Sequence, residues 1–354
     1  MNKHLDTFET TITRLGIALE PQGQFEEEGV LNPACALDRQ GRLLLYTRAV
    51  ARDNVSRVGI VRVSENEDGS LKTERLGFAL EPQAQYERNG AVGEGCEDPR
   101  VTYIPKLGLY LMLYTAYGAQ GPRVAVASSQ DGYQWERIGL VQFPAHLNLH
   151  PDDKDAAFFP EPVKSPDGVL SIAFYHRPMV HIPPQVGKDE IESVLNAATA
   201  ARQSIRIAYV PLADVVADLK NITRPTESAL VMAPDGAWGH VKVGGGTAPV
   251  RIAEGWLSVY HGVDAVARET GGYAMRYSAG IVVHDAAQPH RIHYASTQAP
   301  VLVPSTTAEL EGTVNNVVFP TALVPRPDLG QRTFDCYYGM ADFRIGRFRL
   351  QLAN

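Results

Sequence analysis

Residues 97–118 read EDPRVTYIPKLGLYLMLYTAYG, and this stretch carries the pattern that decides the fold. Pro99 stands near the start of a run of β-branched and aromatic residues, a turn follows at Gly108, and an apolar run then leads to Tyr114. Two such runs separated by a glycine-containing turn are typical of a β-hairpin. The stretch therefore predicts two antiparallel strands, the first of them headed by a proline.

The same pattern occurs in four further segments, at residues 32–48, 159–178, 247–264 and 318–342. Each tyrosine-bearing strand is followed by another β run, namely RVGIVRV, RVAVASS, IRIAYVP, YSAGIVVHD and FRIGRFRL. A hairpin plus a third strand, recurring five times at about 70 residues per unit, favours a five-bladed β-propeller. A β-sandwich, the alternative, does not explain why a proline-headed strand precedes each tyrosine-bearing one.

We therefore predict an all-β protein, a five-bladed β-propeller with short helical insertions. The propeller is expected to be a single domain over residues 26–354, and residues 1–25 an N-terminal extension that packs on the outside or against a partner chain. The expected insertions are two helical patches around the third unit, at residues 189–203 and 212–221. The first is rich in Ala, Leu and Glu and follows a Pro-Pro breaker.

Composition excludes several classes of protein. The 354 residues include 33 Lys and Arg against 40 Asp and Glu, and the formal charge of −7 with no basic run gives no footprint for nucleic acid or an anionic membrane. Three cysteines (Cys35, Cys96, Cys336) are too few for a disulfide framework, and no spacing resembles a zinc site. No stretch approaches the roughly 18 apolar residues of a membrane helix, so we expect a soluble, cytoplasmic protein.

Polar and charged side chains cluster where the proline-headed and tyrosine-bearing strands would meet the axis of a propeller. They are Asn32, Arg48, Glu97, Asp98, Arg100, Lys154, Asp155, Glu161, His176, Arg177, His261 and Asp342. Carboxylates and guanidinium groups ringed by tyrosines suit a polyhydroxylated substrate and an anion. Each residue also has a simpler interpretation: EDPR as a turn with an ion pair, His261 as a core histidine, and the tyrosines as packing between blades.

Seven strings, in order, resemble glycoside hydrolase family 130. They are GCEDPRVTYIP…LMLYTAYG, KDAAFFPEPV, FYHRP, GGGTAPVRIAEGWLSVYHGVD, YSAGIVVHD, ELEGTVNNVVFPTALV and YYGMADFRIG. The resemblance runs from about residue 30 to the C-terminus. It implies a β-mannoside phosphorylase or a β-1,2-mannosidase on a five-bladed propeller.

The resemblance also implies a role for individual residues. Asp98 matches the general acid of an inverting reaction, whose proton reaches the glycosidic oxygen through a mannose hydroxyl, and that role asks for a raised pKa. Arg123, Lys154, Arg177 and His261 match the family's phosphate-binding positions. Mannose-binding positions are matched by Asn32, Arg48 and Asp342, and Tyr114 and Tyr260 are expected to line the same channel. This chemistry uses inorganic phosphate as co-substrate and needs neither metal nor cofactor.

The retained cations favour phosphorolysis, which yields mannose 1-phosphate. An inverting β-1,2-mannosidase is the enzyme alternative, with Glu161 as the nearest carboxylate that could activate water. A non-catalytic sugar-binding propeller is the third. The linkage, the acceptor sugar and the oligomeric state, a homo-oligomer included, stay open.

Overall fold

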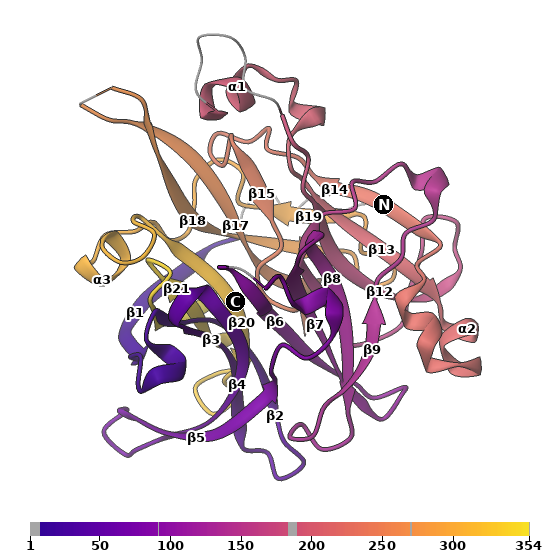
Figure 1. Cartoon of the computed structure of the whole chain (residues 1–354), viewed down its shortest axis with the longest axis horizontal. Helices are drawn as coiled ribbons and strands as arrows, with labels where there is room; N and C mark the ends of the chain where they lie inside the picture. Colours follow the sequence, from indigo (N-terminus) through magenta and orange to yellow (C-terminus); the bar gives the residue numbers. More distant parts are fainter. Residues whose placement is uncertain (1–7, 91, 183–189, 270, 354) are drawn as a thin grey trace.

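The computed structural model describes residues 8–90, 92–182, 190–269 and 271–353. Strands dominate this part of the chain, together with three short α-helices (Figure 1). The prediction of an all-β protein with short helical insertions is confirmed. Among the described residues, no helix is both long enough and apolar enough to cross a membrane.

The strands form four sheets. The largest, with eight strands, contains β2 (Gly29–Leu37), β3 (Leu43–Ala51), β4 (Val55–Glu65), β5 (Leu71–Leu80), β6 (Glu94–Ile104), β7 (Leu109–Gly118), β8 (Gly121–Ser129) and β9 (Glu136–Leu140). The second contains β10 (Asp153–Phe158), β11 (Val163–Lys164), β12 (Leu170–Pro178), β13 (Ile205–Pro211) and β14 (Glu227–Met232). The third contains β15 (Lys242–Gly244), β16 (Val250–Ile252), β17 (Gly255–Ala267), β18 (Tyr273–His284) and β19 (Ile292–Ala295). The fourth has the order β1 (Thr10–Leu19), β22 (Arg344–Leu352), β21 (Thr333–Met340) and β20 (Val318–Pro325).

The eight-stranded sheet consists of two antiparallel groups, β2–β5 and β6–β9. Only a short parallel pairing joins them, in which Val55 faces Glu94 and Ser56 faces Gly95. Gly95 has φ +132°, and a Cβ there would collide with the Ser56 carbonyl, so this close approach requires glycine. The described chain thus forms five antiparallel groups, four of consecutive strands and a fifth of β20–β22 with β1.

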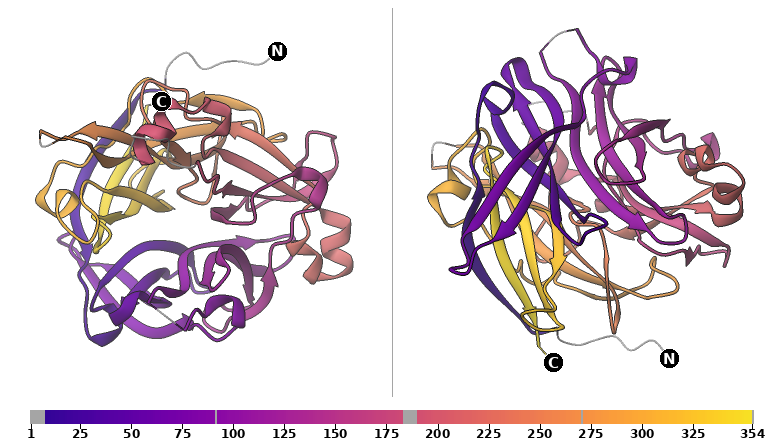
Figure 2. Two further views of the ribbon diagram at one scale, coloured as in Figure 1. Left: turned by 45° about the horizontal axis from the view of Figure 1, so that its top comes forward. Right: turned by 90° about the horizontal axis from the view of Figure 1, so that it is seen from below.

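The first strand of each group lies at the edge of that group, and several of these first strands lie next to one another. Strand β2 contacts both β6 and β20, and β6 contacts β10. Figure 2 shows the groups arranged around a common centre. The proline-headed segments therefore gather in the middle of the molecule.

Five hydrophobic clusters hold successive groups together. Tyr46 packs with Met112 between the first and second groups, Leu113 with Phe174 between the second and third, and Tyr175 with Trp256 between the third and fourth. A fourth cluster joins the fourth and fifth groups, and the remaining one joins the fifth group to the first. The packing therefore closes on itself.

The N-terminal region differs from the predicted extension over residues 1–25. Residues 10–19 form β1, which pairs with β22 from Thr10–Leu352 to Leu19–Ile345 and lies beside the C-terminal strands in Figure 1. Ile12 packs against the cluster between the last two groups, and Leu19 is buried in the cluster that joins the last group to the first. Part of the predicted extension is thus the outermost strand of the fourth sheet, because its alternating apolar residues give it a face to bury.

Both helical insertions are shorter than predicted. Helix α1 spans Glu190–Asn196 and is followed by a 3₁₀ turn at Thr199–Ala201, while residue 189 lies outside the described residues. Arg202 donates to the carbonyl oxygens of Leu195 (2.8 Å) and Ala197 (2.9 Å). Because these carbonyl groups are satisfied by a side chain, the helix can end without further helical N–H donors. Helix α2 spans Leu212–Ala217, and a 3₁₀ turn at Leu219–Thr223 follows it. A third helix, α3, spans Thr307–Leu310.

Candidate active site

Three neighbouring strands, each the first of its group, break their pairing at the same place. The breaks lie between Leu31 and Ala34 in β2, between Glu97 and Arg100 in β6, and between Lys154 and Ala157 in β10. Each break contains one residue with a left-handed backbone: Asn32 (φ 45°), Asp98 (φ 47°) and Asp155 (φ 59°). Asn and Asp tolerate this conformation better than other non-glycine residues, and a bulge re-aims its side chain. The sequence thus presents three short polar side chains from adjacent strands.

Asp98 lies at the centre of this arrangement and is 5% exposed. Its Oδ1 accepts a hydrogen bond from Asn32 Nδ2 at 2.8 Å, and Arg48 Nη1 lies 3.4 Å from the same oxygen. Lys154 Nζ lies 3.9 Å from Oδ2. Arg48 also donates to Glu97 Oε1 at 2.7 Å. The structure therefore brings together Asn32, Arg48, Asp98 and Lys154 as the sequence predicts.

The charges around Asp98 oppose the raised pKa expected of a general acid. Burial raises the pKa of Asp98, but the positive charges of Arg48, Lys154 and Arg100 and the Asn32 hydrogen bond outweigh it, so the pKa lies below its ordinary value. The raised pKa belongs to Asp342, which follows β21. Burial and the negative charge of Asp98 raise the pKa of Asp342 to about 6.

Asp155 organises the second half of the site. Its Oδ2 accepts from Arg177 Nε at 2.5 Å, and His261 Nε2 lies 3.6 Å from the same oxygen. Burial raises the pKa of Asp155, but the opposing effect of Arg177, His261 and Lys154 is larger. The pKa therefore lies below its ordinary value, and this carboxylate is ionised. Arg177 also donates to Gln203, the last residue of the predicted 189–203 patch. Lys154 and Arg177 are paired residues of the neighbouring strands β10 and β12.

His261 lies with this group but is not a cation. Its side chain is fully buried, and burial lowers its pKa to about 3, against the raising effect of Asp155. The ring lies 4.3 Å from that of Phe319. Neither ring nitrogen has a hydrogen-bond partner among the described residues. His261 is therefore a neutral imidazole that can exchange hydrogen bonds with a ligand.

Arg123, the fourth predicted phosphate-binding residue, is held elsewhere by its neighbours. Its guanidinium donates to the Asp152 carboxylate and to the Pro122 carbonyl. Asp152 also lies 3.8 Å from His181 Nε2. Arg123 thus has its own carboxylate partner, and no contact joins it to Lys154 or Arg177 in the described chain.

Tyr114 and Tyr260 do not lie with the charged group. Tyr114 is buried in the cluster between the first two groups, where its hydroxyl donates to Glu87 Oε1 at 2.6 Å. Tyr260 stacks on Trp238 at 5.4 Å between ring centroids. Side chains alternate along a strand, so when His261 faces the site its neighbour Tyr260 faces the core. The simpler interpretation of these tyrosines, packing between groups, is the one the structure supports.

Glu161 is likewise remote. It is exposed and follows the C-terminal end of β10, whereas Lys154 and Asp155 lie at the N-terminal end of that strand. His176 is a structural residue, because its ring bonds Asp153 at 2.6 Å and Ser228 at 2.8 Å. Neither residue joins the group around Asp98.

Two further cations belong to the site, although the sequence did not single out the first. Lys242, on β15, lies with its Nζ 5.3 Å from the centre of the Tyr277 ring. Arg100 is fully buried and donates to the carbonyl oxygens of Gly246, Asp98 and Pro99, so it braces the backbone of the bulge. Lys242 sits two residues before Gly244 in the sequence, and only the pairing of β15 with β17 shows which side it faces.

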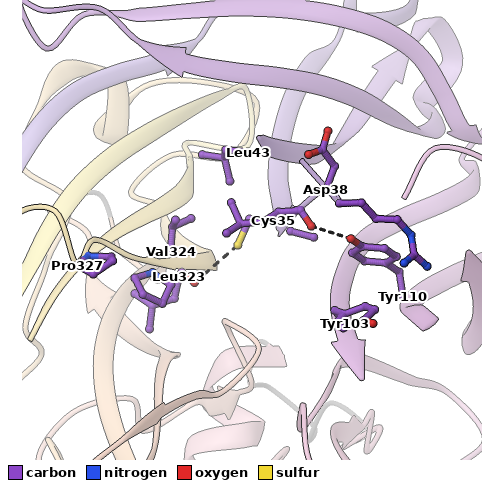
Figure 3. Close-up of a pocket in the computed structure, with 12 residues that line it drawn as sticks. Cys35, Asp38, Leu43, Tyr103, Tyr110, Leu323, Val324 and Pro327 are labelled. Carbon is purple, nitrogen blue, oxygen red and sulfur yellow. Dashed lines mark hydrogen bonds between the residues drawn. The ribbon is translucent and has the colours of Figure 1, made fainter. Parts of the chain in front are cut away.

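A cavity of about 630 Å³ lies toward the opposite ends of β2, β6 and β20 (Figure 3). It is lined by Cys35 and Leu37 from β2, by Tyr103 from β6, and by Leu323 and Val324 from β20. These residues follow the bulges by several positions, and their side chains are mostly apolar. Acid–base chemistry is better served by the charged group around Asp98.

Comparisons with known proteins identify the family of the chain. A family model described as β-1,4-mannooligosaccharide phosphorylase matches residues 12–354. The chain belongs to glycoside hydrolase family 130. The resemblance seen in the sequence is thereby confirmed, and the match includes most of β1 and every residue of the candidate site.

Individual relatives of family 130 are distant. A 1,2-β-oligomannan phosphorylase of Thermoanaerobacter sp. (strain X514) is 28% identical over 94% of this chain and 93% of its own length. The solved structure of a β-1,2-mannobiose phosphorylase from Listeria innocua, in complex with β-1,2-mannobiose, is similar with a TM-score of 0.59 at 22% identity, over 97% of this chain and 86% of that one. Another structure, reported with family 130 glycoside hydrolases that target β-1,2-mannosidic linkages in Candida mannan, has a TM-score of 0.64 at 19% identity, over 97% of this chain and 93% of that one. These two likenesses show the fold.

No group of three or more His, Cys, Asp or Glu residues in the described ranges could hold a metal ion.

Proposed function

We propose that this family 130 protein is an inverting phosphorylase that cleaves a β-mannoside with inorganic phosphate to give α-mannose 1-phosphate and a shorter sugar. The observation that carries the proposal is the placement of Lys154 between two carboxylates, 3.9 Å from Asp98 and next to Asp155 with its Arg177. A cation cluster beside an acid is what an anionic nucleophile requires, because the phosphate needs no base to activate it.

In this reaction a phosphate oxygen attacks the anomeric carbon from the face opposite the leaving sugar, and the glycosidic C–O bond breaks. The leaving oxygen takes a proton that comes from Asp98, relayed by a mannose hydroxyl as the family resemblance implies. Asp98 must therefore be protonated in the reacting complex. Phosphate supplies the means: when its negative charge pairs with Lys154, that lysine no longer holds the pKa of Asp98 down.

We assign the sugar to the Asn32, Arg48 and Asp342 side of the site and the phosphate to the Lys154, Arg177 and His261 side. Asn32 supports this assignment because its Oδ1 is buried and has no hydrogen-bond partner among the described residues. His261, being neutral, contributes hydrogen bonds to the phosphate and not charge. Arg123 takes part only if it leaves Asp152.

We infer, as well, that the five antiparallel groups are the blades of a five-bladed propeller. The closure of the hydrophobic clusters from the fifth group back to the first supports this inference. Asp98 then lies on the inner strand of the second blade, near the axis where the inner strands meet.

The substrate we propose first is β-1,2-linked mannobiose or a longer oligomer, because the Thermoanaerobacter relative with that specificity matches over nearly its whole length. The family model is described for β-1,4-linked oligosaccharides, so β-1,4-mannobiose is the necessary comparison. The test is incubation of the enzyme with each disaccharide, with and without phosphate, followed by analysis for mannose 1-phosphate and free mannose. Mannose 1-phosphate formed only with phosphate supports the proposal.

Hydrolysis is the second candidate. One similar solved structure is reported for a family that contains both mannoside phosphorylases and glycoside hydrolases acting on β-1,2-mannosidic linkages. Phosphate-independent release of mannose would establish it. Glu161 is a poor water-activating base on account of its exposure and its position beyond β10, so Glu161→Gln should leave either activity unchanged. No turnover of either disaccharide, together with tight sugar binding, would instead indicate a non-catalytic sugar-binding protein.

A further inference from the structure

A polar cavity of about 560 Å³ lies in the second group, beside the turn that joins β7 to β8. Its lining includes Gln83, Gln85, Tyr86, Arg88, Asn89 and Gln120. None of these residues belongs to the charged group around Asp98, and none of the described residues that line the cavity is a carboxylate. The cavity is therefore a separate feature with its own chemistry.

The cavity lies at the same end of the sheet as the candidate acid. Tyr117, near the end of β7, pairs with Gly95, three residues before Asp98. In the turn that follows β7, the backbone N–H of Ala119 donates to the Arg88 carbonyl at 3.1 Å. The two segments that line the cavity are thus joined to each other, at the end of the second group that carries Asp98.

The turn between β7 and β8 also separates the cavity from the third group. Gln120 lines the cavity, and the next residue, Gly121, approaches Asp152, since a Cβ there would lie 3.1 Å from Asp152 Oδ1. Asp152 is the carboxylate that holds Arg123, and it lies two residues before Lys154. The cavity and the phosphate half of the candidate site are therefore one turn apart.

The segment beside the cavity, residues 80–87, is similar in sequence to residues 19–26 in the first group. In the first copy, side chains at these positions contact other parts of their own group. Gln22 Oε1 accepts from Arg75 Nη1 at 2.9 Å, and the Phe25 ring packs edge-on against a second phenylalanine ring at 5.1 Å. The first copy thus engages its own side chains.

The second copy leaves its amide groups free. Its arginine, Arg137, bonds the glutamate of that copy as in the first, but within the described chain it makes no hydrogen bond to Gln83. The side chains of Gln83, Gln85 and Gln120 have no hydrogen-bond partner among the described residues, and each amide offers two donors and an acceptor. Tyr86, in the place of a phenylalanine, is half-buried beside them.

The lining indicates the class of ligand. Amides both donate to and accept from hydroxyl groups, and an aromatic ring packs on the apolar face of a sugar. Arg88 is the single cation among the described residues of the lining, and its Nε already donates to the Pro82 carbonyl at 3.0 Å. The cavity therefore suits a neutral, polyhydroxylated molecule better than an anion.

We infer that this cavity is a second carbohydrate-binding site, which holds a distal part of a long β-mannoside whose end lies in the candidate active site. The inference rests on the proposed β-mannoside specificity and adds a site to it. A second attachment raises the effective concentration of the chain end at the site of cleavage. Long oligomers should benefit from the cavity, and a disaccharide in the active site should not.

The first experiment detects binding without turnover. Asp98→Asn protein is mixed, in the absence of phosphate, with mannohexaose of β-1,2 or β-1,4 linkage, and amide hydrogen exchange is followed by mass spectrometry. Residues 83–90 and 119–120 should exchange more slowly when the hexaose is bound. Adding Gln85→Ala and Gln120→Ala should abolish this protection and leave protection of the strands around Asn32 in place.

The second experiment measures the dependence of turnover on chain length. The variant with Gln85→Ala and Gln120→Ala should raise KM for mannohexaose by about fivefold to thirtyfold, the worth of one or two hydrogen bonds. The values of kcat, KM for mannobiose and KM for phosphate should stay unchanged. Gln24→Ala, an exposed glutamine at the matching position of the first copy, is the control and should behave like wild type.

Substitutions of Tyr86 separate ring packing from hydrogen bonding. Tyr86→Phe introduces the residue that the first copy carries at Phe25, keeps the ring and should resemble wild type. Tyr86→Leu removes the ring and should raise KM for mannohexaose, again without changing KM for mannobiose.

Hexaose binding that protects the active-site strands but not residues 83–90 would overturn the inference and leave the proposed function standing. An equal rise in KM for mannobiose and mannohexaose would also overturn it, because it would indicate a structural role for the glutamines. Protection of residues 83–90 in a protein whose wild type turns over no β-mannoside would overturn the proposed function and support the carbohydrate site.

Discussion

At the scale of single residues, the site depends on one backbone feature that occurs three times, a bulge with a left-handed residue. Asn32, Asp98 and Asp155 each occupy the left-handed region within a bulge of the first strand of a group, so three polar side chains leave the regular alternation of their strands. Such backbone positions cost free energy and persist where surrounding contacts enforce them. Arg100 supplies such contacts by bonding the carbonyls of Asp98, Pro99 and Gly246.

Asp98→Asn keeps the size of the side chain and its hydrogen-bond acceptor but removes the proton donor. We expect kcat for phosphorolysis to fall by about 10²- to 10⁴-fold, the usual contribution of a general acid, with little change in mannoside affinity. Steady-state kinetics with β-1,2-mannobiose and phosphate make the measurement. A variant that keeps more than about a tenth of the wild-type kcat would assign the acid to another group.

Gly339 on β21 controls the position of Asn32. A Cβ at residue 339 would collide with Asn32 Oδ1, so Gly339→Ala should displace the amide that donates to Asp98 at 2.8 Å. We expect Gly339→Ala and Asn32→Ala each to lower kcat by roughly tenfold, the worth of one hydrogen bond to a charged group.

The double variant tests whether the two positions act through one contact. Because both changes break the same hydrogen bond, Asn32→Ala with Gly339→Ala should be little worse than either single change. Fully multiplicative losses in kcat would show that Gly339 acts by another route.

Asp342 makes stability depend on pH. Its pKa rises from 3.8 to about 6 on folding, so the native state binds more protons between these values and the free energy of unfolding falls as pH rises through them. Asp342→Asn removes this effect and should stabilise the protein by about 1–3 kcal/mol at pH 8, with the gain vanishing below pH 4. Denaturant unfolding at pH 4 and pH 8 makes the comparison, and a gain equal at both would assign the effect to something other than ionisation.

At the scale of elements, three short helical segments each bind the outermost strand of their own group through a buried glutamate. Glu26 pairs with Arg75 on β5, and Glu87 with Arg137 on β9. Glu309 pairs with Arg14 on β1 and also accepts from the Tyr338 hydroxyl. The first two of these segments are similar in sequence, LEPQGQFE at 19–26 and LEPQAQYE at 80–87. These glutamates are the signal by which the N-terminal strand could have been recognised, because each marks a turn that needs an arginine partner.

Arg14→Met should therefore cost about 1–3 kcal/mol of unfolding free energy, since it leaves the buried Glu309 carboxylate without its cation. Arg62→Met is a matched control: Arg14 and Arg62 are both 31% exposed, but Glu74, the partner of Arg62, is 58% exposed whereas Glu309 is 0% exposed. The control should cost less than about 1 kcal/mol. Equal losses in denaturant unfolding would contradict the role assigned to Glu309.

The sequence predicted the strands better than it predicted which side their residues face. Proline-headed hairpins repeat, so the all-β class and the clustering of Asn32, Arg48, Asp98, Lys154 and Arg177 followed from pattern and resemblance. Tyr114 and Tyr260 were misplaced because a tyrosine in an apolar strand could face either the centre or the core, and both pack in hydrophobic clusters between groups. Lys242 was missed because its strand is three residues long and only its pairing with β17 directs it.

At the scale of the whole molecule, closure of the packing depends on residues from both ends of the described chain. β1 pairs with β22, and the cluster that joins the fifth group to the first contains Leu19, Val30 and Ile345. No single group is complete without its neighbours, because each hydrophobic cluster is shared between two of them. The candidate site, built from strands of several groups, exists only when these shared clusters have formed.

The pairing of β1 with β22 also means that, during synthesis, the first strand must wait for its partner until the last strand has been made. Ribosomes add about 5–20 residues per second, so the interval between the emergence of the first and the last strand is roughly 15–65 seconds. During that interval β1 offers unsatisfied backbone groups and a half-apolar face with no partner to receive them. Nascent chains stalled before residue 344 should therefore engage chaperones through their first 20 residues, and release of the last strand should end that engagement.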